Sequence, residues 1–453
     1  MPDEPVKIRD VAWSEMFPWL ILTRAVRISL LARVLVLAAL GLLATIAGWS
    51  LLGKAFSHIS DPVVARFPEV TNLAIWQDPL RSGMPNPWVN TYAPDAPEVF
   101  LSATHGLLHA PISIWVYLTQ PFIQMFHGSL TPMGFLFLIL CGVWELLVWG
   151  LFGGAITRIA ALKFTRDEAP SMFAALKHAA VKLPSYSLPP LIALGGTAVF
   201  ALQLVVVGLL MNFSIFAFLI ALIWPFVLLL GLLMAFLLLG ALAGWPLMWA
   251  TVSVEGTDGF DALSRSYAYV YHRPWRLLWY VLFAGFLAVA SMFVVKLFAS
   301  SAVTLGNWSL DWGLNETTLQ TVVAPRPTPN ASPELPMLEV VPGGAAPDRA
   351  IAPTTTAAPL PEPTGLWAAT KSVIGFWKSL VAALVAGYQA GFLWVSAVGI
   401  YLLLRRDIDG VQLNEVYLEQ ADEYGLPPLV EDPVTGVPEV AAGAPAIPGD
   451  IRD

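Results

Sequence analysis

The sequence predicts an all-α fold, a polytopic transmembrane helical bundle of about six spans with cytoplasmic amphipathic surface helices. Hydrophobic residues make up 57% of the chain and charged residues only 12%, whereas a soluble chain carries about 25% charged residues. The segment from Leu183 to Val254 has no Asp, Glu, Lys, Arg or His. As one helix it would be about 108 Å long, against roughly 30 Å for a bilayer core. We therefore expect two spans there, with a bend at Asn212, Phe213 and Ser214.

The first expected span, 30–52, follows a cytoplasmic or interfacial amphipathic segment, 1–29. An outer loop, 53–132, then contains a second apolar stretch, 107–126, which prolines and polar residues interrupt. If 107–126 crossed the membrane, the basic loop that follows the next span would face outward. We therefore expect 107–126 to be a re-entrant or interfacial helix on the outer side.

Spans two, three and four are expected at 133–156, 188–211 and 215–243. Two cytoplasmic surface helices alternate with these spans, one within 157–187 and one within 244–276. The order is thus span, surface helix, span, and it occurs twice.

Span five is expected at 277–295 and span six at 379–404. The outer linker between them, 296–371, includes a 45-residue stretch, 321–365, with 11 prolines, a composition that favours extended chain. The acidic tail, 405–453, begins with apolar and acidic residues mixed up to Leu418, which predicts a short ordered piece docked on the cytoplasmic face.

Basic residues predict the orientation of these spans. Sixteen Lys and Arg residues lie on the side of the two termini, and eight lie on the other side in much longer loops. Because Lys and Arg are enriched in cytoplasmic loops, we expect both termini in the cytoplasm.

A short repeat flanks the charge-free segment. Phe173-Ala-Ala-Leu-Lys-His178 is followed, 87 residues later, by Phe260-Asp-Ala-Leu-Ser-Arg265. Both copies have the apolar spacing of an amphipathic helix, and Asp258 is the expected N-cap of the second. Either the two copies are an internal duplication, as in transporters with parallel repeats, or the likeness arose by chance.

Two residues within the expected spans are candidate sites. Glu145 is the only acidic residue in a span, where a carboxylate costs about 2.5–3.5 kcal/mol on insertion scales. It is either a proton or cation site or a protonated side chain that bonds a neighbouring helix. Pro225 is expected to kink the fourth span, either as a hinge or as static packing.

Histidines on the outer side are the only candidate metal ligands. His105 and His109 are four residues apart and share a helical face, and His127 lies on the same side. Imidazoles can bind zinc, copper or a haem iron, and the alternative is interfacial histidines at a helix end. The chain has one cysteine, Cys141, and no metal-binding or haem-attachment motif, so we expect no cofactor.

No catalytic motif is found, so we expect no enzyme, and no basic stripe indicates a nucleic-acid partner. The leading interpretation is a non-catalytic structural or accessory subunit of a membrane or envelope assembly. Its expected partners are membrane lipids and other membrane proteins or a second copy. The alternatives are a transporter or permease for a lipid or small solute, and a haem- or metal-binding redox subunit.

Three stretches, together under a tenth of the chain, carry a resemblance. Residues 17–30 and 401–411 resemble the start and the close of uncharacterised multi-pass inner-membrane proteins of planctomycete-type bacteria. The surface-helix sequence from Phe260 to Tyr267, with Arg273 to Leu278, looks like a signature of several bacterial membrane families. The resemblance implies a location in the bacterial inner membrane, and it assigns no activity or site residue.

Overall fold

A computed structural model describes residues 17–58, 64, 67, 114–126, 130–315, 318, 322–323, 364–413, 415–418, 429–431 and 438–440. Over these residues the fold is all-α, and six of the helices found there are long and apolar enough to cross a membrane. The chain is therefore an integral membrane protein. These six helices are α3 (Ala32–Ala55), α6 (Pro132–Thr165), α8 (Leu183–Leu210), α10 (Trp224–Glu255), α12 (Pro274–Asp311) and α14 (Leu366–Asp409).

Shorter elements connect or flank the long helices. A 3-10 turn and a short helix lead into the bundle, two surface helices join long helices, and one short helix forms a tip. In that order they are η1 (Pro18–Leu22), α2 (Thr23–Ser29), α7 (Met172–Val181), α11 (Gly259–His272) and α9 (Ser214–Leu222). Strands β1 (Leu429–Glu431) and β2 (Pro438–Val440) pair antiparallel in the tail, with Leu429 opposite Val440.

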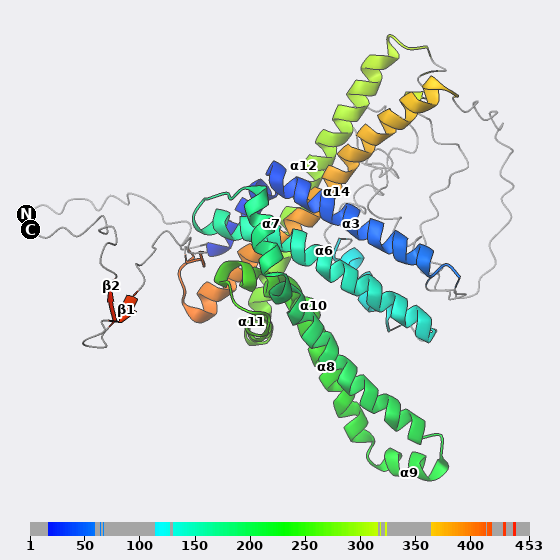
Figure 1. Ribbon diagram of the computed structural model, residues 1–453, viewed down its shortest axis with the longest axis vertical. Coiled ribbons are helices and arrows are strands. Elements are labelled where there is room, and N and C mark those ends of the chain that lie inside the picture. Colours follow the sequence, from blue (N-terminus) through cyan, green and yellow to red (C-terminus); the bar gives the residue numbers. More distant parts are fainter. Residues whose placement is uncertain are drawn as a thin grey trace, which may run out of the picture.

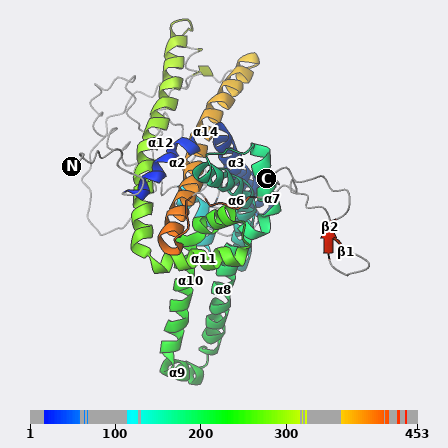
Figure 2. The same cartoon turned by 90° about the vertical axis from the view of Figure 1, so that its left-hand side faces the viewer.

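Three pairs of long helices, α3 with α6, α8 with α10 and α12 with α14, diverge from one end of the molecule (Figure 1). We call this end the base, and it holds α2, α7, α11 and the last turns of α14. Figure 2 shows the α8–α10 pair and the α12–α14 pair extending from the base in opposite directions. Because α14 also packs against α3, α6 and α10, it lies at the centre of the bundle.

Burial differs sharply between these helices. We compare the share of residues that are buried in the most apolar stretch of each helix. This share is 78% in α14 and 50% in both α3 and α6, but only 11% in α8 and 6% in α10. Close approach in the centre depends on glycine, since a Cβ on Gly153 would lie 2.8 Å from the Trp249 ring. The core is therefore a trunk of α3, α6, α14 and the base ends of the others. We call the part of α8 and α10 beyond the base, together with α9, the arm.

The charge-free segment forms the arm, with its bend near the expected place. Helix α8 ends at Leu210, and the Asn212 amide donates to the Leu209 carbonyl at 3.1 Å. A second break follows at Ile223, so the expected span 215–243 is divided into α9 and α10. Pro225 therefore does not kink the middle of a helix. It lies in the first turn of α10, where proline is tolerated because a backbone N–H, which proline lacks, would have no intrahelical acceptor there.

Several helices run beyond the expected spans. Helix α6 continues to Thr165, α10 to Glu255 and α12 to Asp311, and α14 begins at Leu366. These ends contain charged residues. The expected spans stop at such residues because they end an apolar run, but a charged side chain does not interrupt the hydrogen bonds of a helix. The extensions of α6 and α10 carry polar groups to the base, and those of α12 and α14 lie at the far end from it.

The described part of the expected re-entrant segment is helical over residues 114–124. It packs inside the bundle: the Tyr117 ring lies 5.1 Å from Trp49, and the Trp115 ring lies 5.6 Å from Trp245. Trp245 is ten residues before the base end of α10, so this helix reaches deep among the long helices. Residues 107–113 lie outside the described residues, and the re-entrant or interfacial placement of 107–126 stays a prediction.

Candidate functional site

Buried polar groups gather at two places in the trunk, and the first is at the base. Helix α10 ends because Gly256 adopts a left-handed conformation with φ of 67°. Two residues on, the Asp258 carboxylate accepts the N–H of Asp261 at 2.9 Å and caps α11. This tight connection turns α11 back beside α10 and leaves Glu255 as the last residue of α10.

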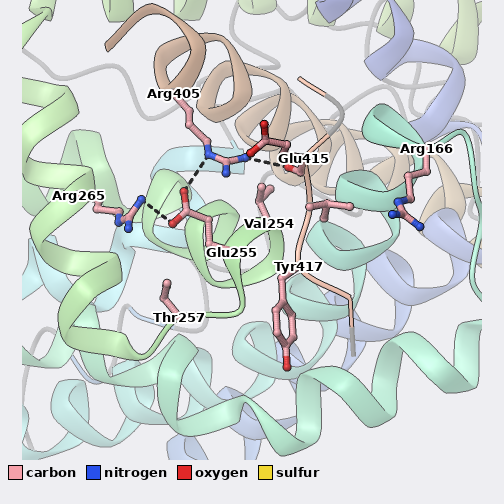
Figure 3. A pocket seen from close by; sticks show the side chains of 9 residues that line it. Arg166, Val254, Glu255, Thr257, Arg265, Arg405, Glu415 and Tyr417 are labelled. Carbon is pink, nitrogen blue, oxygen red and sulfur yellow. Dashed lines mark hydrogen bonds and ion pairs between the residues drawn. The ribbon is translucent and has the colours of Figure 1, made fainter. Parts of the chain in front are cut away.

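Glu255 binds three side chains from two other helices, and Figure 3 shows two of them, Arg265 and Arg405. Its carboxylate lies 2.6 Å from Arg265 of α11 and 3.0 Å from Arg405 of α14, and it accepts the Tyr401 hydroxyl at 2.5 Å. The Glu255 side chain is only 8% exposed. Arg405 is also largely buried, and removing one partner of such a buried pair costs about 3–5 kcal/mol. These contacts, which we call the base junction, therefore fasten α10, α11 and α14 together.

Arg265 shows the electrostatic character of the base junction. Burial acts to lower the pKa of this guanidinium, but the carboxylates of Glu255 and Asp261 outweigh it. The pKa of Arg265 therefore lies above its ordinary value. The base junction is therefore an ionic contact between α10, α11 and α14.

The start of the tail crosses the base as an extended strap, residues 415–418, in agreement with the expected docked piece. The Tyr417 N–H donates to the Val254 carbonyl at 2.7 Å. Arg158, which is 5% exposed, donates to the carbonyls of Ser253 and Tyr417, each at 2.9 Å. Arg405 donates to the Glu415 carbonyl at 2.8 Å. The strap thus ties the tail to α6, α10 and α14.

A cavity of about 660 Å³ opens beside the strap. Figure 3 shows Arg265 and Arg405 on one side of the strap and Arg166 on the other. Glu255 and Glu415 also line the cavity, and most of the charges there are engaged with each other. The arrangement holds elements together.

The second place is the core around Glu145. Its side chain is wholly buried, and neither carboxylate oxygen has a hydrogen-bond partner among the residues that the structure describes. Helix α6 places Cys141, Glu145 and Trp149 on one face at four-residue spacing. Tyr117 lies close enough to interact electrostatically with Glu145, and its hydroxyl has no partner within the same described residues.

Four tryptophans form a cluster on the base side of this core. The Trp249 and Trp394 rings stack at 4.4 Å, and Trp394 also lies 5.6 Å from Trp245 and 5.9 Å from Trp149. We call these four residues, from α6, α10 and α14, the tryptophan cluster. Aromatic pairs of this kind contribute about 0.5–1.5 kcal/mol beyond their buried area, so the cluster joins the three central helices.

The two interpretations of Glu145 differ in the hydrogen-bond partner that they require. A structural Glu145 requires a hydrogen-bonding group on a neighbouring helix, and the described part of the chain offers none to its carboxylate. Burying such a group without a partner is costly. Both the proton or cation interpretation and the structural interpretation of Glu145 stay predictions.

The candidate metal ligands cannot be placed. His105, His109 and His127 lie outside the described residues. Within the described residues, no three His, Cys, Asp or Glu side chains gather where they could hold a metal ion.

Sequence reasoning missed the base junction. Glu255 and Tyr401 are 146 residues apart, and no local pattern links them. One signal could have indicated it: Glu255 follows the charge-free segment and Arg405 follows the last span, and the predicted topology puts both on the same side of the membrane.

Comparisons with protein-family models, with curated proteins and with solved structures found no match. The resemblance to bacterial inner-membrane proteins accordingly stays a prediction from the sequence.

Proposed function

We propose that this integral membrane protein is a non-catalytic structural or accessory subunit of a membrane assembly, and that its arm contacts another membrane protein. The tail strap and the base junction would then hold the trunk rigid while the arm projects into the bilayer. The partner is a protein with a transmembrane helix that packs along α8 and α10.

Glycines that point outward from the arm carry this proposal. A Cβ added at Gly195 or Gly208 of α8, or at Gly231 of α10, would have nothing within 4 Å. A glycine in a helix costs about 0.8–1.0 kcal/mol relative to alanine, and here the described structure shows no packing in return. In membranes, small residues at helix surfaces let another helix approach closely. Outward glycines on an uncovered arm are thus the expected features of a helix-packing surface.

The test is the size of the complex extracted from native membranes in mild detergent, measured by light scattering. We expect the wild-type protein in a complex heavier than one chain, and Gly208→Leu or Gly231→Leu to reduce that mass. Gly285→Leu is the matched control, because Gly285 of α12 has the same open surroundings outside the arm. A monomeric wild type, or an equal effect of Gly285→Leu, would contradict the proposal.

A transporter or permease for a lipid or small solute is the second candidate, because Glu145 is buried without a partner in the described part of the chain. A carboxyl group in that position can take up and release a proton or bind a cation. Flux into vesicles reconstituted with Glu145→Gln is the test. If flux is observed and this variant does not change it, the charge-based form of the candidate is excluded.

A further inference from the structure

The repeat of the sequence returns in the structure as two matching helices. Ser171 caps α7 by accepting the Ala174 N–H at 3.1 Å, and Asp258 caps α11 by accepting the Asp261 N–H at 2.9 Å. The capping residue of the second copy lies 87 residues after that of the first copy, and the residue whose N–H it accepts is shifted by the same 87 residues. The two helices therefore begin at the same point of the repeat, with the same capping geometry.

Burial also agrees at the repeated positions. Ala175 and Ala262 are 1% and 0% exposed, and Leu176 and Leu263 are both half-buried against the core. The side of each helix that packs on the trunk is therefore centred on the alanines.

The two phenylalanines point away from the trunk. Phe173 is 79% exposed and Phe260 is 67% exposed. Each lies two residues before a buried alanine, which is about 200° around a helix. Leaving a phenylalanine in water forfeits about 1.5–3 kcal/mol of burial. A large apolar side chain exposed twice at the same point of a repeat indicates a common environment that removes both from water.

Lipid is the environment that the surroundings favour. Helix α7 joins the apolar helix α8 through Lys182 alone, and α11 joins α12 through Arg273 alone, so both lie at the ends of spans. Val181 is 70% exposed and Trp275 is 80% exposed beside these joints, and aromatic residues are enriched at the membrane interface.

The residue before Phe260 packs against the base end of α8. An added Cβ on this residue, Gly259, would lie 2.9 Å from Leu188, and Leu188 is 45% exposed. Near Phe173, the exposed Lys177 follows one turn later, where its ammonium group can reach lipid phosphates.

We propose that Phe173 and Phe260 are paired membrane anchors, whose rings insert among the lipid headgroups of the leaflet at the base. The occupant of this surface is phospholipid, not a second protein. Each anchor fixes the depth and tilt of the span that follows its helix. The proposal does not depend on the proposed function, because it concerns the base and not the arm.

Spin labelling of the full chain in vesicles of phosphatidylcholine and phosphatidylglycerol tests the proposal. The single cysteine is buried, so a Cys141→Ala background accepts one label at a time, at Phe173→Cys or at Phe260→Cys. Collision with oxygen, compared with a water-soluble nickel complex, measures depth. Labels at Glu168→Cys and at Leu202→Cys, both exposed, serve as the water and lipid references.

We expect both phenylalanine sites to lie about 5–10 Å below the phosphate level, at matching depth, between the two references. Labels as accessible to nickel as the Glu168 label would overturn the proposal. Labels shielded from both oxygen and nickel would also overturn it, because they would show a protein on this surface. Quenching of a bimane dye at the same sites by headgroup-labelled lipid checks the depth independently and does not depend on the nitroxide.

Discussion

Gly256 connects two features of the base, the end of α10 and the strap. Its φ of 67° lies in the left-handed region, which costs other residues about 1–2 kcal/mol. A Cβ at this position would also overlap the ring of Tyr417. Glycine is therefore required here both by its own backbone and by the strap that passes over it.

Gly256→Ala should lower the unfolding temperature in detergent, because it adds a clash with Tyr417 to the conformational cost. Gly410→Ala is the control, since Gly410 has a similar φ of 69° but nothing within 4 Å of an added Cβ. Equal losses in the two variants would show that the strap does not press on Gly256 in solution.

Tyr267 is a single residue that should make the stability of the folded protein depend on pH. Its hydroxyl donates to the Leu237 carbonyl at 2.6 Å, and burial, with a smaller effect of Tyr271, raises its pKa from 10.0 to about 12. Below pH 10 the phenol is neutral in both the folded and the unfolded state. Above pH 10 the unfolded phenol ionises first, so the stability that Tyr267 contributes is lost as the pH rises toward 12.

Tyr267→Phe should therefore show a shallower fall of the unfolding temperature between about pH 10 and pH 12 than the wild type. At pH 8 the variant should lose only the hydrogen bond, about 0.5–1.5 kcal/mol. Parallel curves for the two proteins across the alkaline range would contradict the prediction.

At the scale of elements, the tryptophan cluster decides how α10 and α14 meet. Trp394 is fully buried and stacks on Trp249 with an angle of 17° between the rings. Trp394→Ala should cost about 3–5 kcal/mol, the usual loss for a large aromatic side chain in a core. Denaturant unfolding followed by tryptophan fluorescence measures it.

Trp367 provides the matched variant on the same helix. It is 55% exposed, so Trp367→Ala should change stability by about 0.5 kcal/mol or less. A comparable loss in both variants would mean that the centre of α14 is not more tightly packed than its far end.

For the whole molecule, the arrangement of the helices predicts which segments share a side of the membrane. The loop after α6 and the end of α14 both lie at the base, and α14 is about 66 Å long at 1.5 Å per residue. Single cysteines at Glu168 and Gln412 should therefore react on the same side with an impermeant maleimide, and one at Leu366 on the opposite side.

We expect the base to be cytoplasmic, so the first two sites should be protected in intact cells and reactive in inverted vesicles. Reaction of the Glu168 and Gln412 sites on opposite sides would contradict the topology. It would show that another segment crosses the membrane between them.

Some features of the fold could be predicted from the sequence and others could not. The spans could be predicted because crossing a bilayer requires about 20 consecutive apolar residues, and such runs are local. The division of the fourth span at Ile223 could not, because nothing in its apolar composition distinguishes a break from a helix. Glu145 could be identified as unusual, whereas the lack of a partner for its carboxylate among the described residues depends on how Trp149 and its neighbours pack.

The sequence by itself determined the class of the protein, the number of long apolar helices and the place of the repeat, because hydropathy and capping act over a few residues. Only the tertiary structure decided that the charge-free segment stands apart as an arm, that Glu255 meets Arg265 and Arg405, and that Phe173 and Phe260 point outward. Each of these depends on which surfaces of distant helices pack together. A linear pattern does not specify such contacts, because one apolar helix face fits lipid, a neighbouring helix or another protein equally well.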